Sequence, residues 1–445
     1  MLNLLKKTYH SLPIDKLTFL KDIPDELLYG RNYFQKLNNV TTSKKVIKPN
    51  LYNLLKYTKE HTQYGQEKIP SHFTVEDVEH LIKELPIINS TELNQNFEYY
   101  VSRNANRFNS YFTTTGGTGG APASIQLSNS SYTDEWTHLN TIWGKVGYKK
   151  KSDVKLMLRG KHIDGKSLSK FNPIYNEVIV DSFRINQANF QQLINEISFF
   201  SPSYFHGYPS LAKEIMNYAI QNNYKFNFKC LFLGSEELNL ELKKQLSDFF
   251  NCPILSWYGH SEKCILAECQ PTDRDDHFRV YTSYGIPRVI NIDETGFGEL
   301  VGTSFINPAM PLINYSTGDF AKIIEDDDSI YIANPKGRWG KDFIYLTPDK
   351  KVSTCTINLH GDIQKFLTGY QIIQSQFGKI EIQLSPNSLY LGKIDSLENE
   401  FEKIMRNNLV GFDISVKAVN EKDLIRSHRG KLRMLVQNLK NLKDI

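Results

Sequence analysis

The chain has 445 residues, of which 40% are hydrophobic and 23% are charged, and its formal net charge is +4. These values exclude intrinsic disorder, collagen-like repeats and a coiled-coil rod as the main architecture. A charge of +4 spread over this length does not indicate nucleic-acid binding, which needs a clustered basic face.

The sequence also predicts no membrane span. No apolar run approaches the ~20 residues of a membrane-spanning helix, and the N-terminal residues 1–7 hold too short an apolar segment for a signal peptide. Five cysteines are a low and odd number, so we expect no disulfide framework. We therefore expect a soluble, cytoplasmic protein.

The first part of the chain, to about residue 100, is predicted to be mostly helical. One helix is expected to open at Thr74, whose hydroxyl is typical of a helix cap, and to end at Pro86. After a loop rich in threonine and glycine, an amphipathic helix is expected to carry Trp136 to Val146 and to stop at Gly147.

Three strands are then predicted in quick succession, at residues 203–206, 230–233 and 253–257. Helices over residues 211–219 and 238–249 separate them, and this alternation indicates a parallel sheet with right-handed crossovers. Each strand is followed by a polar cluster. Because ligands of such sheets bind beyond the carboxyl ends of the strands, the three clusters are expected to face one site.

The last third of the chain is predicted to change architecture. Antiparallel strands are expected within residues 295–335, and a boundary at 337–342. A compact α+β segment should follow, with the strands 369–374, 379–384 and 413–419 and the helix 397–405.

The loop Thr113–Pro122 is the sharpest chemical signal. Its glycines let backbone N–H groups approach phosphate oxygens, and its threonines add hydroxyl donors. It is neither a Walker loop nor a G-x-G-x-x-G motif. The alternative interpretation is a flexible surface loop.

Four further clusters each allow two interpretations. Asp319 could accept both hydroxyls of a ribose or belong to an ordinary turn behind a glycine. Glu262 could hold a metal or cap a following helix. Arg338 alone is typical of a surface charge, and residues 427–431 alone are typical of a basic, solvated loop.

Together and in this order, the clusters resemble the motifs of the adenylate-forming superfamily, which includes acyl-CoA ligases, luciferases and adenylation domains. The resemblance rests on five segments: Thr114–Pro122, Tyr258–Glu262, Tyr315–Asp319, Gly337–Arg338 with Asp342, and Gly430–Lys431. It spans roughly residues 70–435. Residues 205–210, 232–236, 256–262 and 370–378 are most similar to the phenylacetate–CoA ligase-like branch, especially to its capsular polysaccharide biosynthesis proteins.

The resemblance implies an α/β fold: a large N-terminal domain of stacked mixed sheets and helices, residues 1–337, and a small mobile α+β domain, residues 338–445. It implies an ATP-dependent ligase that converts a small-molecule carboxylate to an acyl adenylate with release of pyrophosphate. A thiol, most simply that of CoA, then displaces AMP.

It also implies roles for single residues. The phosphate loop would cradle the β- and γ-phosphates, Glu262 would hold Mg²⁺, and Lys431 would bridge the carboxylate and the α-phosphate. Asp319 and Arg338 would fix the ribose, and Asp342 would be the hinge of the small domain. The loop residues are Thr114, Thr115, Gly116, Gly117, Thr118 and Gly119; the other nucleotide-binding residues are Gly234, Ser235, Glu236, Tyr258, Gly259, His260 and Ser261.

Two departures from the family pattern stand out. Gly119 replaces the usual serine or threonine, so the loop has one hydroxyl donor fewer. Asp342 lies one residue later than its counterpart in some relatives.

Three further interpretations concern single side chains. His206 and Tyr208 are candidates for the acyl pocket, with a core histidine and a capping turn as the alternatives. Cys264, Cys269 and His277, with Cys252, could form a zinc site, but their spacing is not the tight Cys-x₂-Cys of structural zinc, so ordinary thiols are favoured.

The sequence leaves two other functions open. The acyl group could pass to an amine, such as an amino sugar, or to a carrier protein. The chain could also be a non-enzymatic nucleotide-binding protein, but Lys431 and Asp319 are both retained, which favours an enzyme. The identity of the acid and the oligomeric state do not follow from the motifs.

Overall fold

The structure is a computed structural model of the chain. It describes residues 18–114, 123–161, 163–272, 277–336, 343–348, 351–353, 363, 366–387, 390, 392–409, 411–426, 432–433 and 435–439. No helix in these ranges is long and apolar enough to cross a membrane.

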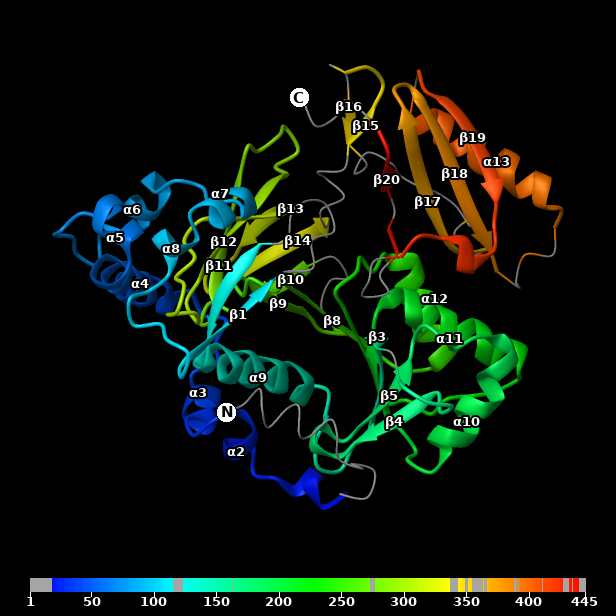
Figure 1. Cartoon of the computed structure of the whole chain (residues 1–445), viewed down its shortest axis with the longest axis horizontal. Helices are drawn as coiled ribbons and strands as arrows, with labels where there is room; N and C mark the ends of the chain where they lie inside the picture. Colours follow the sequence, from blue (N-terminus) through cyan, green and yellow to red (C-terminus); the bar gives the residue numbers. More distant parts are fainter. Residues whose placement is uncertain are drawn as a thin grey trace.

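Helices form most of the described N-terminal segment, as predicted. They are α2 Asp25–Tyr29, α3 Tyr33–Asn38, α4 Ile47–His61, α5 Gln63–Lys68, α6 Val78–Glu84, α7 Ser90–Gln95 and α8 Phe97–Tyr100. The expected cap is wrong in detail: α6 begins at Val78, and the Thr74 hydroxyl donates to the Asp77 carboxylate at 2.8 Å. Figure 1 shows α4 to α8 together beside the antiparallel strands β11 to β13, whose bounds follow below.

The middle of the chain builds the parallel part of a 12-stranded sheet. Its strands run in the order β8-β7-β6-β3-β5, with β4 pairing antiparallel at the edge. The bounds are β3 Lys155–Lys161, β4 Ser169–Asn172, β5 Glu177–Asp181, β6 Tyr204–Gly207, β7 Cys230–Gly234 and β8 Ile254–Gly259. The three predicted strands and their parallel pairing are thus confirmed.

Helices cover both faces of this parallel part. On one face Phe205 and Leu231 pack in the core that includes residues of α10 Phe190–Ser198, α11 Pro209–Gln221 and α12 Leu240–Phe250. On the other face Tyr204 and Phe232 pack with Trp143 of α9 Asn129–Gly144. Alternate side chains point to opposite faces of a strand, so strands covered on both faces must be apolar throughout.

Antiparallel strands extend the same sheet, because β9 pairs antiparallel with β8. Beyond it the order is β9-β10-β14-β13-β12-β11. The bounds are β9 Leu266–Cys269, β10 His277–Val280, β11 Gly285–Ile290, β12 Gly298–Ser304, β13 Tyr315–Glu325 and β14 Ile330–Lys336; a separate hairpin joins β1 Ser110–Thr114 to β2 Ser124–Ser128.

The C-terminal part forms its own four-stranded sheet, in the order β19-β18-β17-β20, with α13 Ile394–Asn408 packed against it. Leu397, Phe401 and Met405 of α13 recur at helical spacing and lie in a separate core. The strands are β17 Leu367–Gln376, β18 Lys379–Pro386, β19 Asp413–Ala418 and β20 Leu435–Gln437, and a small hairpin pairs β15 Phe343–Tyr345 with β16 Lys351–Ser353.

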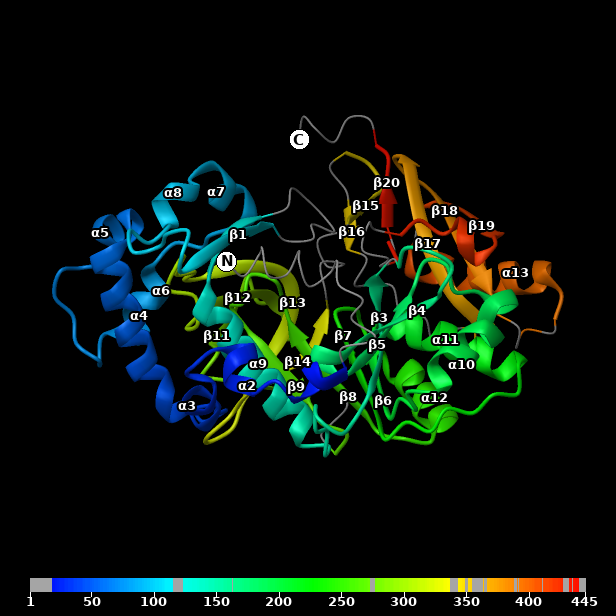
Figure 2. The same ribbon diagram turned by 60° about the horizontal axis from the view of Figure 1, so that its bottom comes forward.

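This arrangement confirms the predicted mixed α/β fold with a small α+β unit. Figures 1 and 2 both show the C-terminal sheet beside α11. Arg426 reaches Glu214 of α11 at 4.0 Å, so the two parts touch there. The expected boundary at 337–338 lies outside the described residues, and the mobility of the small unit stays a prediction.

Candidate active site

Three parallel strands end in glycine at one edge of the sheet: β6 at Gly207, β7 at Gly234 and β8 at Gly259. A Cβ on Gly207 would lie 2.6 Å from the carbonyl oxygen of Leu158, and one on Gly234 would lie 2.9 Å from the Trp257 ring. Close packing therefore requires glycine at both positions. The polar residues that follow each strand lie along this edge, and Glu236 after β7 contacts Ser210 after β6. That all three clusters form one site stays a prediction.

The segments Tyr258–Glu262 and Tyr315–Asp319 are joined by two hydrogen bonds. The Tyr258 hydroxyl donates to Asp319 Oδ2 at 2.6 Å, and the Tyr315 hydroxyl donates to Glu262 Oε1 at 3.1 Å. Burial and the neighbouring Asp319 carboxylate raise the pKa of Tyr258 well above its usual value, so the phenol stays protonated as a donor.

Asp319 does not lie in an isolated turn. Residues 315–319 begin the strand β13, and Gly318 has a φ of +79°. The strand pairing shifts register nearby, between Glu299 and Val301 of β12. The glycine thus permits a left-handed residue inside a strand, and this irregularity brings Asp319 to Tyr258.

Glu262 is a buried carboxylate, only 2% exposed. Its second oxygen, Oε2, lies 3.1 Å from His260 Nδ1. The next element after it is the strand β9, so the alternative interpretation of Glu262 as a helix cap is wrong. Nε2 of His260 is buried and has no hydrogen-bond partner among the described residues.

His206 and Tyr208 lie at the end of β6 and are both buried. The His206 ring packs against both Trp143 and Trp257, with centroid distances of 5.2 and 5.7 Å. Burial, together with the nearby Arg159, lowers the pKa of His206 well below its usual value, so the imidazole is neutral. Tyr208 is the residue before α11, in the extended conformation of a helix cap.

Arg159 is a residue of this edge that no motif indicates. It stands near the end of β3, where Nη1 lies 3.4 Å from His206 Nε2 and Nη2 donates to Ser235 Oγ at 3.3 Å. Its guanidinium carbon also lies 5.8 Å from the centre of the Tyr208 ring. The residues next to Arg159 in the sequence do not indicate a functional role, because its hydrogen-bond partners lie 47 and 76 positions away.

The segment Gly234–Glu236, which is predicted to bind the nucleotide, also makes contacts that stabilise the fold. Ser235 has a φ of +67°, so the chain turns sharply after β7. The Glu236 carboxylate accepts hydrogen bonds from the backbone N–H and the hydroxyl of Ser210, at 3.0 and 3.1 Å. Ser210 lies in the first turn of α11, where a carboxylate is stabilising.

Several predicted residues lie outside the described ranges. Thr114 ends β1, but only its backbone is described. The structure therefore does not test the phosphate loop, the ribose arginine, the hinge or the terminal lysine. The residues concerned are Thr115, Gly116, Gly117, Thr118, Gly119, Arg338, Asp342 and Lys431.

The cysteines that are described are buried free thiols: Cys230, Cys252, Cys264 and Cys269. Burial raises the pKa of Cys264 well above its usual value, which favours the thiol over the metal-binding thiolate. Among the residues that the structure covers, no group of three or more His, Cys, Asp or Glu side chains could hold a metal ion.

Comparisons with known proteins find a relative in sequence and two structures with a similar fold. The chain is 21% identical to protein CapK of Staphylococcus aureus over 316 residues, which cover 68% of this chain and 67% of that protein. Two structures of 2-hydroxyisobutyryl-CoA ligase in the postadenylation state, with R3-HIB-AMP and with 2-HIB-AMP, share its fold. The TM-scores are 0.64 and 0.63 at 14% identity, over 88% of this chain and 89% of the ligase.

A sequence model matches residues 41–294, which is more than half of the chain. The matched residues include the strands β3 to β8 as well as Tyr258 and Glu262. The model describes the AMP-binding enzymes, and this protein belongs to that family.

Proposed function

We propose that this protein is an ATP-dependent ligase that activates a carboxylic acid as an acyl adenylate and then transfers the acyl group to the thiol of CoA. The observation that carries the proposal is the pair of hydrogen bonds between two motifs 53 to 61 positions apart, Tyr258 to Asp319 and Tyr315 to Glu262. Membership of the AMP-binding enzymes and the fold shared with a CoA ligase support it.

In this proposal Asp319 accepts the ribose hydroxyls of ATP. The buried Tyr258 hydroxyl fixes the orientation of the Asp319 carboxylate through the 2.6 Å hydrogen bond. Arg338 completes the ribose contact. Gly234, Ser235, Glu236 and Gly259 border the adenine, since they lie at the ends of the strands adjoining Tyr258.

Glu262 fits a magnesium ion that accompanies ATP. Mg²⁺ is usually held by one or two carboxylates together with the phosphates of the substrate. Glu262 presents a buried carboxylate at this edge, with the Tyr315 hydroxyl donating to Oε1 and His260 Nδ1 lying 3.1 Å from Oε2. Bound there, Mg²⁺ would offset phosphate charge.

The first reaction forms one bond and breaks one. A carboxylate oxygen of the acid bonds to the α-phosphorus of ATP, the α–β phosphoanhydride bond breaks, and pyrophosphate leaves with that electron pair. Lys431 would lie against the carboxylate and the α-phosphate as negative charge shifts, and the phosphate loop, residues 114–119, would hold the leaving group.

In the second reaction the CoA sulfur attacks the acyl carbon, the bond from that carbon to the phosphate oxygen breaks, and AMP leaves. The thiol proton passes to solvent. Asp342 would be the hinge that lets the small domain serve both reactions.

An amine or a carrier-protein thiol is the second candidate acceptor. The resemblance to capsular polysaccharide biosynthesis proteins and the similarity to CapK over 68% of the chain favour an amino sugar as that amine.

The test measures AMP release from Mg·ATP and an active acid, with CoA or with amino sugars as acceptor. Release that depends on CoA supports the thiol. AMP release that depends on an amino sugar and does not change with CoA would identify the acceptor as an amine instead of a thiol. The proposed adenylation step would still stand.

A further inference from the structure

Arg159 lies on the side of the candidate active site that is distant from Tyr258 and Asp319, the residues proposed to bind the ribose. The pairing of β3 with β6 joins Leu158 to Gly207, so Arg159 is one residue beyond the last pair of the two strands. Tyr258 stands on β8, three strands away. Because neighbouring strands are about 4.8 Å apart, the backbone of Arg159 lies roughly 14 Å along the sheet edge from that of Tyr258, although the Arg159 side chain reaches Ser235 at the end of β7.

The guanidinium has no carboxylate partner among the described residues. Its hydrogen bonds reach only neutral groups, the imidazole of His206 and the hydroxyl of Ser235. Glu177 of β5 interacts electrostatically with Arg159 but forms no ion pair with it among the described residues. The Glu177 carboxylate accepts from Asn172 at 3.0 Å and pairs with Lys155 at 3.8 Å.

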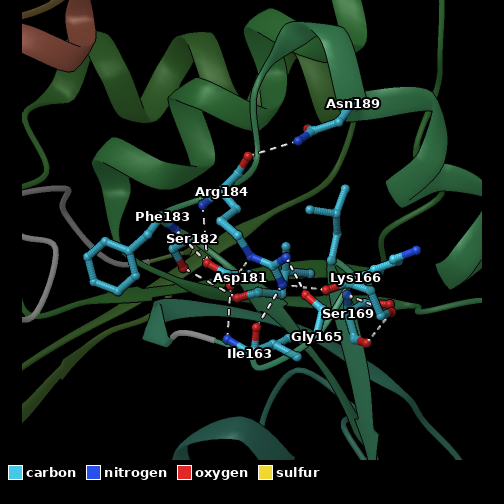
Figure 3. A network of polar contacts seen from close by, with 12 residues as sticks. Ile163, Gly165, Lys166, Ser169, Asp181, Ser182, Phe183, Arg184 and Asn189 are labelled. Carbon is cyan, nitrogen blue, oxygen red and sulfur yellow. Dashed lines mark hydrogen bonds and ion pairs between the residues drawn. The ribbon is translucent and has the colours of Figure 1, made fainter.

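Arg184 has a structural role, and its hydrogen-bond partners differ from those of Arg159. Its Nε donates to Asp181 at 2.7 Å, and its two Nη atoms donate to the carbonyl oxygens of Ile163, Gly165 and Ser167 (Figure 3). A carboxylate and three carbonyl groups therefore satisfy Arg184. They also anchor the loop that follows β3.

The contrast between the two arginines indicates an anionic ligand for Arg159. A half-buried cation without a counter-ion is unfavourable, and the planar fork of a guanidinium matches a carboxylate in a bidentate contact. The groups in contact with Arg159 are neutral: the rings of His206 and Tyr208 and the hydroxyl of Ser235. An anion placed there would meet the guanidinium directly, while the charges of Lys155 and Glu177 lie farther off and pair with each other.

We propose that Arg159 binds a second carboxylate on the acid that is activated, so that the substrate is a dicarboxylic acid. This proposal rests on the proposed function, since it names the substrate class of the same site. One carboxylate of the substrate would face the α-phosphate, and the other would pair with Arg159, against His206 and Tyr208. Arg159 would thus be a specificity-determining residue.

The experiment compares acids of equal chain length with one or two carboxylates: butyrate with succinate, pentanoate with glutarate, and hexanoate with adipate. Pyrophosphate release is measured for the wild type, Arg159→Ala and Arg159→Lys. We expect the wild type to favour the diacid of at least one pair. Arg159→Ala should reduce the diacid-to-monoacid ratio of kcat/KM about 10- to 100-fold, the range for hydrogen bonds to charged groups, and Arg159→Lys should restore part of it.

The matched control is Lys166→Ala, which removes one exposed positive charge from the loop after the same strand; it should leave the ratio unchanged. Binding of the same acids to the folded protein without ATP, measured by calorimetry, gives a second readout. The wild type should bind the preferred diacid and Arg159→Ala should bind it at least 10-fold more weakly.

The outcomes separate this inference from the proposed function. Equal use of monoacids and diacids by the wild type, or an unchanged ratio in Arg159→Ala, overturns the role of Arg159 and leaves adenylation standing. A raised KM for ATP with an unchanged ratio would assign Arg159 to the nucleotide and overturns it too. Diacid binding without any pyrophosphate release would support Arg159 while contradicting the ligase.

Discussion

The Tyr258 hydroxyl lies 2.6 Å from Asp319 Oδ2 and links β8 to β13, two strands that are not neighbours in the sheet. In the order of the sheet, β9, β10 and β14 lie between these two strands. The hydrogen bond makes Tyr258 a positioning residue, because its raised pKa keeps the phenol a donor to the carboxylate that would receive the ribose.

Tyr258→Phe should therefore raise the KM for ATP about 5- to 20-fold, with a smaller effect on kcat. A hydrogen bond to a charged group typically contributes about 1.5–3 kcal/mol, and we expect an effect at the lower end because Tyr258 acts on ATP through Asp319. Steady-state kinetics of pyrophosphate release against ATP concentration measure the change. The control is Tyr52→Phe, at a half-buried tyrosine of α4. An unchanged KM for ATP in Tyr258→Phe would remove the ribose role of the pair.

Glu262→Gln should lower pyrophosphate release about 100-fold, equivalent to about 3 kcal/mol, and should raise the Mg²⁺ concentration needed for half-maximal rate. The amide can still accept from Tyr315, but it carries no charge for the ion. Tyr315→Phe is the matched variant, since it removes that hydrogen bond and keeps the carboxylate. An identical Mg²⁺ dependence in Glu262→Gln and the wild type would contradict the metal role.

Lys431→Ala should reduce pyrophosphate release about 10²–10³-fold and leave ATP binding intact, because the lysine would act on charge that develops during attack. Lys431 lies outside the described residues, so this prediction comes from the sequence motif. Lys422→Ala removes an exposed charge from the same part of the chain as a control. Normal pyrophosphate release by Lys431→Ala would end the assignment of the terminal lysine.

His138 should make the protein less stable in acid. Burial lowers the pKa of His138 from 6.5 to about 4; Nδ1 donates to the carbonyl oxygen of Asp134 at 2.7 Å, and Nε2 accepts from Ser283 at 2.9 Å. Between these pH values the unfolded chain binds a proton that the folded protein does not. The contribution of His138 to the free energy of unfolding is therefore fully present above pH 6.5. It decreases by up to about 3 kcal/mol as the pH falls to about 4.

Urea unfolding at pH 7, 6 and 5 measures this loss. His138→Gln should flatten the decline relative to the wild type, while His80→Gln, at a side chain that is 75% exposed, should not. Parallel pH profiles for the wild type and His138→Gln would refute the role of His138.

The sequence predicts three of the parallel strands, β6, β7 and β8, because each is a short apolar run between turn residues, but it does not predict β3 and β5. Residues 230–234 are all buried, and glycine follows the last apolar residue of the run. Helix α13 is also predictable from the sequence, because Leu397, Phe401 and Met405 recur at helical spacing on one face. These patterns are local, and the tertiary structure agrees with them.

The site is less predictable where contacts join distant segments. Gly318 suggests a turn, but it serves an irregular point within β13 that only strand pairing explains. Arg159 belongs to no motif and acquires its place from β3 beside β6. Glu236 follows a predicted nucleotide segment, yet its described contacts cap α11 through Ser210. Such roles depend on neighbours across the sheet.

The central claim is that a carboxylate oxygen of the substrate bonds to the α-phosphate of ATP. An acid labelled with ¹⁸O in its carboxylate tests this directly, with the acid that gives the fastest pyrophosphate release from Mg·ATP and with CoA as acceptor. Mass spectrometry of the products should find one ¹⁸O in AMP and none in pyrophosphate. AMP without label, or products consisting of ADP and phosphate, would contradict the account.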